Sequence, residues 1–223
     1  VLRPLLRADR GVLVTEDTVG PLWAAGAREA LEAAGLSLEV VVLPAGEAQK
    51  SLETWQQCVD ALLAARVDRH TPVIALGGGV PGDIAGFAAA TTLRGLPLVQ
   101  LPTTVLAMVD SSVGGKTGVN HSSGKNLIGS FHQPRAVFAA LDTLTTLPER
   151  ERVAGLAEAV KTALIGDASL LDHMEREAES LRAGERGALA PVIARCVELK
   201  AEVVRTDERE GGWRAVLNAG HTV

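Results

Sequence analysis

Three motifs between Leu76 and Asn126 decide the fold: LGGGVPGD (76–83), LPTT (101–104) and DSSVGGKTGVNHSSGKN (110–126). They bring glycine turns, two lysines, two acidic residues and several hydroxyls next to apolar runs that are typical of strands. Glycine lets backbone N–H groups approach a ligand closely, and clustered amides and lysines attract anions. The stretch therefore predicts a site that wraps phosphate-bearing molecules.

Strands and helices are expected to alternate on both sides of these motifs. Apolar runs predict strands at 11–15, 38–43, 72–76, 97–101 and 136–141, and helical periodicity follows at 19–34, after Ser51, and at 83–93. Such alternation predicts a parallel sheet covered by helices on both faces. From Leu147 the pattern changes to three helical segments, 148–166, 169–181 and 189–208. We therefore expect an α/β domain at 1–145 and an all-α domain at 146–223, with the C-terminal part of the second domain missing.

The composition limits the function classes. The chain has 223 residues and a formal net charge of -5, so it has no general attraction to nucleic acid or to an acidic membrane surface. No apolar run has the length of a membrane span. Cys58 and Cys196 both fall in helical patterns, which favours reduced core thiols and a cytoplasmic protein.

The glycine turn has the spacing of a dinucleotide fingerprint. Gly77, Gly79 and Gly82 fit G-x-G-x-x-G between a strand and a helix, where a pyrophosphate would meet the helix N-terminus. Pro81 lies inside the motif, the motif follows the third strand, and no acidic residue stands about twenty positions further on. On this motif alone, a tight strand-to-helix turn is an equally good interpretation. Glu47 is the alternative acid for ribose hydroxyls, or a solvated loop charge.

The lysines of the third motif predict an anion-binding loop. Lys116 and Lys125, with Asn126 and the neighbouring backbone amides, would form the cradle. A flexible linker has a similar composition, but apolar residues flank this segment and predict that it folds against the body of the protein. Asp110 is either part of the site or a turn cap.

One acidic residue lies in an otherwise apolar helix. Glu158 and Lys161 are three residues apart and share a helix face, so they form either a surface ion pair or part of a cleft. A carboxylate in an apolar setting needs a cation, and a metal ion is one candidate. Asn218 and His221, near the end of the chain, would add a nitrogen ligand, although a glutamate with one distant histidine is not a specific zinc pattern.

Seven blocks in order give the chain a family resemblance. They are GEAQK (46–50), GGGVPGDIAGFAAATTLRG (77–95), LPTT (101–104), VDSSVGGKTGVNHSSGKNLIGSFHQP (109–134), LPERERVAGLAEAVKTALI (147–165), ELKAEVVRTDERE (198–210) and RAVLNAGHT (214–222). Together they resemble the 3-dehydroquinate synthases of the shikimate pathway, and the VDSSVGGKT and GLAEAVK blocks are specific to this family and its cyclase relatives.

The resemblance implies a Rossmann-like NAD-binding domain at 1–145 and a helical metal- and substrate-binding domain at 146–223. It implies a homodimer with bound NAD and a divalent metal, zinc or cobalt. The substrate would be 3-deoxy-D-arabino-heptulosonate 7-phosphate, and the products 3-dehydroquinate and phosphate. NAD would transiently oxidise a ring hydroxyl, phosphate would leave by β-elimination and take the proton itself, and an aldol closure would follow re-reduction and ring opening.

The resemblance also assigns residues by position. The NAD contacts would be Glu47, Lys50, Gly78, Gly79, Val80, Gly82, Asp83, Thr103, Thr104, Lys116, Lys125, Thr143 and Thr146. The substrate contacts would be Asp110, Lys116, Lys125, Asn126, Lys161, Lys200, Arg214, Asn218 and, from the neighbouring subunit, Arg94. The metal ligands would be Glu158 and His221, and the catalytic group Lys116, Glu158, Lys161 and His221.

One departure from the family pattern and two groups of alternative enzymes remain open at this point. A third metal ligand, which the family carries after the GHT motif, is not in the sequence, so a chain ending at Val223 would bind metal weakly and not turn over. Related cyclases that make 2-deoxy-scyllo-inosose, amino-dehydroquinate or a valiolone share the motifs. Metal-dependent alcohol or polyol dehydrogenases share the architecture, but the lysine-rich segment disfavours them because a small polyol needs no phosphate cradle.

Overall fold

The structure is a computed structural model that describes residues 8–209 and 211–220. The chain forms two compact units. The first contains residues 1–102 and 115–139, and the second contains residues 103–114 and 140–223. Residues 103–114 thus group with the second unit, although they precede the expected boundary near residue 145. The assignment of NAD binding to 1–145 and of metal and substrate binding to 146–223 remains a prediction.

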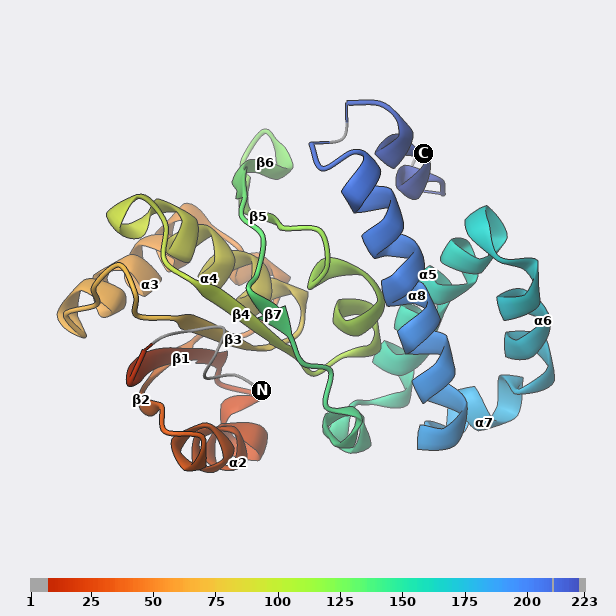
Figure 1. Ribbon diagram of the computed structural model, residues 1–223, viewed down its shortest axis with the longest axis horizontal. Helices are drawn as coiled ribbons and strands as arrows, with labels where there is room; N and C mark the ends of the chain where they lie inside the picture. The colour runs from red at the N-terminus through yellow and green to blue at the C-terminus, as the bar shows by residue number, and fades with distance from the viewer. Residues whose placement is uncertain (1–7, 210, 221–223) are drawn as a thin grey trace. The chain divides into compact units, whose positions relative to one another are not determined.

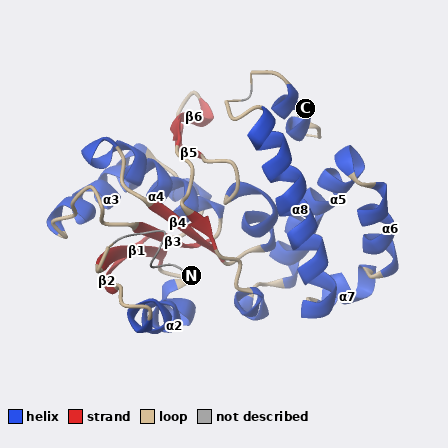
Figure 2. Ribbon diagram, in the orientation of Figure 1, coloured by secondary structure: helices blue, strands red, loops and turns tan. Residues whose placement is uncertain are grey.

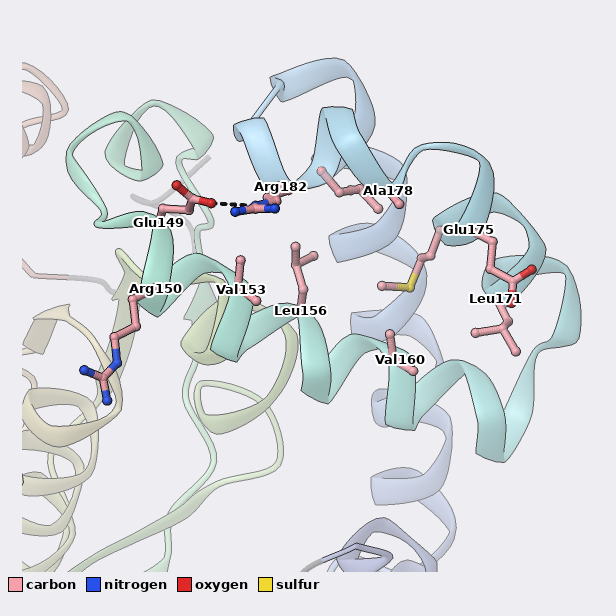
Figure 3. A pocket seen from close by; sticks show the side chains of 11 residues that line it. Glu149, Arg150, Val153, Leu156, Val160, Leu171, Glu175, Ala178 and Arg182 are labelled. Carbon is pink, nitrogen blue, oxygen red and sulfur yellow. Dashed lines mark hydrogen bonds and ion pairs between the residues drawn. The ribbon is translucent and has the colours of Figure 1, made fainter.

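A five-stranded parallel sheet forms the centre of the first unit (Figure 2). Its strands are β1 (Arg10–Glu16), β2 (Ser37–Leu43), β3 (Val73–Gly77), β4 (Leu98–Pro102) and β7 (Ala136–Val137), in the order β2-β1-β3-β4-β7. From β1 the chain passes to β2 at one edge of the sheet, whereas from β3 it passes to β4, toward the other edge. The point between β1 and β3 is therefore a topological switch point, where parallel α/β sheets usually bind ligands.

Helices cover both faces of this sheet, as the sequence predicted (Figure 1). Val12 and Val14 of β1 pack with residues of α3 (Leu52–Ala64) and α4 (Gly79–Thr91), whereas Leu13 packs with Leu31 of α2 (Gly20–Ala33). Successive residues of a strand point to opposite faces, so an uninterrupted apolar strand feeds two cores. Short 3-10 turns η1 (Glu47–Gln49) and η2 (Thr92–Arg94) complete the unit.

The lysine-rich segment is a β-hairpin rather than a loop. Strands β5 (Lys116–His121) and β6 (Gly124–Phe131) pair antiparallel. A Cβ on Gly86 of α4 would come within 2.5 Å of the Thr117 side chain, so glycine is what lets the helix approach β5. The prediction that the segment folds against its surroundings is confirmed, but its regular hydrogen bonding was hidden by the many glycines and serines, which are poor strand formers.

Two other expectations need correction, and one strand is partly exposed. Helix α4 begins at Gly79, four residues before the expected Asp83, because Pro81 occupies the first helical turn, where its missing N–H costs little. The last strand contains only Ala136–Val137 of the expected 136–141. Strand β2 is apolar in sequence but lies at the sheet edge, and Val40 and Val42 on it are exposed.

The second unit is helical. It contains the π-helical turn η3 (Ala107–Ser111), the 3-10 turns η4 (Leu141–Thr146) and η5 (Trp213–Asn218), and the helices α5 (Glu149–Gly166), α6 (Ala168–Arg176), α7 (Ala178–Ala183) and α8 (Arg186–Thr206). Its core joins residues from η3, α5, α6 and α8. The second of the three expected helices is divided at Glu177 into α6 and α7. Helix α6 begins at Ala168, and the carboxylate of the preceding Asp167 caps it by accepting from the amide of Leu170.

Candidate active site

The glycine turn lies at the carboxyl end of β3, beside the switch point of the sheet. Gly77 has a φ of 153°, and a Cβ there would collide with the ring of Pro81. Gly78 precedes α4 in an extended conformation, and no described side chain caps the helix. The first amides of α4 therefore keep their hydrogen-bonding capacity for a ligand, and the helix dipole favours a negative group there.

Gly82 packs closely against β4. A Cβ on it would lie 3.0 Å from Oε1 of Gln100, and Nε2 of Gln100 donates to the Gly82 carbonyl at 3.2 Å. This contact holds the first turn of α4 against β4. Close helix–strand packing is the role that the third glycine has in dinucleotide-binding turns.

Lys50 connects helix α4 to the β5–β6 hairpin. Its ammonium lies 2.5 Å from Oδ2 of Asp83 in α4 and donates to Oδ1 of Asn126 in β6, also at 2.5 Å. The Lys50 residue is only 6 % exposed. Three residues assigned separately by position are thus in one hydrogen-bonded group within the first unit.

Glu47 and Asn126 are joined through a residue that the sequence reasoning missed. Nδ2 of Asn120 donates to Oε1 of Glu47 at 2.9 Å, and Oδ1 of Asn120 accepts from the backbone amide of Asn126 at 2.9 Å. The amide of Asn120 itself donates to the carbonyl of Lys50 at 2.8 Å. The only signal in the sequence was an amide side chain between hairpin residues, which is too common to single out.

The other cations of the first unit that were assigned to the site are exposed. Lys125 is 76 % exposed at its side chain, and its Nζ lies 3.9 Å from Oε1 of Glu47. Lys116 is exposed at the start of β5. Arg94 is also exposed and has a φ of 68°, next to Leu93 at 50°, so two successive non-glycine residues adopt the left-handed conformation. Such backbone strain is most common at functional sites.

The four threonines assigned to NAD lie in the second unit, where three of them have local hydrogen bonds. Oγ1 of Thr104 accepts from the amide of Ala107, Oγ1 of Thr143 donates to the carbonyl of Ala140, and Oγ1 of Thr146 donates to the carbonyl of Thr143. Thr103 is buried. These contacts stabilise turns, so they neither support nor oppose a role in NAD binding.

A buried charge cluster forms in the second unit from residues far apart in sequence. Nζ of Lys200 in α8 donates to both Oδ1 and the carbonyl oxygen of Asp110 in η3, each at 2.5 Å. Burial lowers the pKa of Lys200, Asp110 opposes that shift, and Arg214 reinforces it. An additional anion stabilises the charged form of a buried ammonium more than that of an exposed one, because the buried ammonium has already lost its contacts with water on folding.

Arg214 is 1 % exposed and is close enough to Lys200 to lower the pKa of that residue electrostatically. Its guanidinium donates to the carbonyl of Gly114 at 2.9 Å and to the carbonyl of Glu208 at 2.5 Å. Gly114 has a φ of 101°, and a Cβ there would collide with the guanidinium. The glycine is thus required by its conformation and by the approach of Arg214.

Glu158 and Lys161 form an ion pair on α5, and Nζ of Lys161 also donates to the carbonyl of Leu217 in η5 at 2.7 Å. The side chains are 13 % and 15 % exposed, which supports the cleft interpretation over a surface pair. Glu158 also acts electrostatically on Lys200 and on Cys196. A cavity of about 340 Å³ borders this region, with Thr162, Lys200 and Leu217 among its lining residues.

The fit of the implied metal and NAD differs. The carboxylate of Glu158 is a suitable oxygen ligand for zinc or cobalt. His221 lies outside the described residues, Asn218 is exposed at the end of η5, and within residues 8–209 and 211–220 no group of three acidic, histidine or cysteine ligands is present. The glycine turn, by contrast, could fit a pyrophosphate, since Gly78 and the uncapped start of α4 provide backbone amides, although Pro81 contributes no N–H.

A parallel sheet with a glycine turn at its switch point, followed by a helical unit with a buried charge cluster, is an arrangement typical of nucleotide-dependent α/β enzymes. The chain belongs to the 3-dehydroquinate synthase family: the N-terminal family model matches residues 40–154, and the C-terminal model matches residues 155–223.

Solved structures agree with this assignment. A 2-epi-5-epi-valiolone synthase from Streptomyces hygroscopicus subsp. jinggangensis 5008, with NAD+ and Zn2+ bound, is 36% identical with a TM-score of 0.92. A 2-deoxy-scyllo-inosose synthase complexed with carbaglucose-6-phosphate, NAD+ and Co2+ is 31% identical with a TM-score of 0.90. The alignments cover 99% and 98% of this chain but only 62% and 59% of those chains. An iron-containing alcohol dehydrogenase, 18% identical with a TM-score of 0.70, shares the fold.

Helix lengths and polarity give one further finding. Among the described helices, none combines the length and the apolar character needed to cross a membrane.

Proposed function

We propose that the complete protein is an NAD- and metal-dependent sugar-phosphate cyclase, and specifically a 3-dehydroquinate synthase acting on 3-deoxy-D-arabino-heptulosonate 7-phosphate. The observation that carries the proposal is the buried cluster of Lys161, Lys200 and Arg214. These three cations are accompanied by two carboxylates, Glu158 and Asp110. A substrate that brings a carboxylate or phosphate would complete the charge balance of this cluster.

The proposed roles follow from the contacts. Lys200 and Arg214 would bind an anionic group of the substrate by charge-assisted hydrogen bonds, and Asp110 holds the Lys200 ammonium in place. Lys161, fixed between Glu158 and the carbonyl of Leu217, would orient the carboxylate of Glu158. Bound NAD would supply a hydride acceptor and the metal would polarise the hydroxyl to be oxidised.

NAD is proposed to bind at Gly78–Asp83, with Glu47 and Lys50 near its ribose. The uncapped start of α4 supports this placement. Lys116, Lys125 and Asn126 are proposed to hold the substrate phosphate, and Lys125 and Asn126 have exposed positions in β6 that suit a ligand contact. The roles of Thr103, Thr104, Thr143, Thr146, Asn218 and His221 remain predictions, as do a homodimer with Arg94 at the partner site and a cytoplasmic location.

The alternative product is 2-epi-5-epi-valiolone or 2-deoxy-scyllo-inosose, which the 36% and 31% identities to the two synthases favour. Neither product carries a carboxylate. The cation cluster therefore separates the two proposals. If Lys116, Lys125 and Asn126 hold the substrate phosphate, a substrate carboxylate would be the anion for the cluster, whereas a sugar phosphate without a carboxylate brings no second anion to it.

The test is to incubate the full-length protein, NAD and zinc with the heptulosonate phosphate, and to measure phosphate and dehydroquinate together. Glucose 6-phosphate and a heptulose 7-phosphate that lacks a carboxylate serve as competing substrates. Release of phosphate only from a sugar phosphate without a carboxylate would assign the alternative, and no release from any of the three would reject both. Metal analysis of Glu158→Gln gives a separate test, because unchanged metal content in a folded variant would exclude Glu158 as a ligand.

A further inference from the structure

Asn120 lies where the hairpin loses its regular register. Between the pairs Val119–Ile128 and His121–Gly124, β5 advances by two residues (121 − 119) and β6 by four (128 − 124). The two additional residues make β6 bulge around Asn126, which has a φ of 57°. A bulge removes backbone groups from the ladder and changes the direction of the side chains that it carries.

The side chain of Asn120 replaces the lost ladder contact. Its Oδ1 accepts from the amide of Asn126 at 2.9 Å. Asparagine is among the residues that tolerate a left-handed conformation, but the bulge still needs a partner for its free amide. Asn120 supplies that partner from the opposite strand, and so fixes the backbone that carries Lys125 and Asn126.

The same side chain reaches the loop that precedes α3. Its Nδ2 donates to Oε1 of Glu47 at 2.9 Å, and the amide of Asn120 donates to the carbonyl of Lys50 at 2.8 Å. Lys50 closes the group by donating to Oδ1 of Asn126. One residue therefore holds the 46–50 loop and the tip of the hairpin at the same time.

We propose that Asn120 is a positioning residue that couples the cofactor loop at 46–50 to the phosphate-binding hairpin tip at 125–126. The inference rests on the proposed function, in which Glu47 and Lys50 approach NAD and Lys125 and Asn126 approach the substrate phosphate. Binding at either place orders the other through Asn120, so each ligand increases the affinity for the other by the same factor.

Two variants of Asn120 separate its two hydrogen bonds. Asn120→Ala removes both side-chain bonds. Asn120→Asp keeps an acceptor for the Asn126 amide but places a second carboxylate beside Glu47. His121→Ala is the matched control, because the neighbouring His121 is exposed in the same hairpin and its side chain bonds to Ser123.

The experiment measures the dissociation constants of NAD and of inorganic phosphate for the full-length protein by calorimetry, each with and without the other ligand. We expect Asn120→Ala to weaken NAD about tenfold, the effect of one lost hydrogen bond to a charged group, and to abolish the effect of phosphate. Asn120→Asp should weaken NAD similarly but keep the affinity for phosphate within about twofold. His121→Ala should match the wild type in both.

Hydrogen exchange of the Asn126 amide gives a readout that needs no ligand. Protection should fall in Asn120→Ala and remain in Asn120→Asp. Unchanged protection in a folded Asn120→Ala variant would overturn the positioning role, whether or not NAD binds. Lost protection with unchanged NAD and phosphate affinities would overturn the coupling, and a wild-type protein that does not bind NAD would reject both the coupling and the proposed function.

Discussion

Gly155 sets the distance between two parts of the charge cluster, and its substitution gives a sharp test. It lies in α5, three residues before Glu158, and faces the segment that leads to Asp110. A Cβ on Gly155 would lie 2.5 Å from the amide nitrogen of Leu106 and 2.7 Å from Cβ of Val105. The obstacle is backbone and a branched side chain, so no flexible group can move aside.

The size of the effect follows from two opposing contributions. Real Cβ contacts stay beyond 3.0 Å, so the chain around Leu106 must move by about 0.5 Å (3.0 − 2.5) in Gly155→Ala. Overpacking of this kind costs about 1–3 kcal/mol, whereas alanine gains about 1 kcal/mol over glycine inside a helix. We expect a net loss of about 0–2 kcal/mol (1–3 less 1) and, for a chain of this size, a Tm lower by up to about 6 °C.

The matched control is Gly26→Ala, in the middle of α2. A Cβ on Gly26 would meet no described atom within 4 Å, so only the helix propensity remains. This variant should gain about 1 kcal/mol.

The assay is urea unfolding of both variants at one pH. The expected result is a lower midpoint for Gly155→Ala and a higher one for Gly26→Ala, both with an unchanged slope. If Gly155→Ala proves as stable as Gly26→Ala, the close approach of α5 to residues 105–106 is wrong. Activity gives a second measure, because the same shift would move Asp110 relative to Glu158.

Three further outcomes are expected. The pKa of Lys200 in the folded protein lies below its ordinary value of 10.5, so between these two pH values the unfolded chain binds more protons than the folded one. The free energy of unfolding should therefore rise with pH in that window, and the rise should be absent in Lys200→Met. Urea midpoints measured across the window check this. Leu93→Gly relieves a left-handed residue and should stabilise the fold by about 1 kcal/mol, and a lower Tm would contradict the strain. Burial raises the pKa of Cys58 and of Cys196 to about 12, so a thiol reagent at pH 8 should modify them only after unfolding, and rapid labelling of the folded protein would contradict their burial.

The local sequence was sufficient to predict those elements whose structure depends on residues close together in the chain. The apolar runs of β1 and β3 predicted a parallel sheet because a strand buried on both faces needs no polar side. Ser51 predicted the start of α3, where its Oγ accepts from the amide of Thr54. The length of α4 was underestimated because Pro81 was read as part of a turn, although proline suits the first turn of a helix.

The candidate site could be predicted only in part from the sequence. Family motifs assigned Lys50, Asp83 and Asn126, but their mutual hydrogen bonds depend on a hairpin whose glycines and serines gave no strand signal. Asn120 was missed altogether, because its role comes from a register shift that no periodicity records.

The sequence by itself determined the succession of elements, the family and the residue types of the site, since each depends on neighbours within a few positions or on ordered motifs. Only the tertiary structure placed Asp110 beside Lys200, ninety positions apart, and Arg214 against Gly114, one hundred apart. The physical reason is that burial and charge balance are properties of packed surfaces. The motifs between Leu76 and Asn126 therefore predicted a phosphate site, and packing decided that its hairpin is anchored to Lys50 through Asn126 and Asn120.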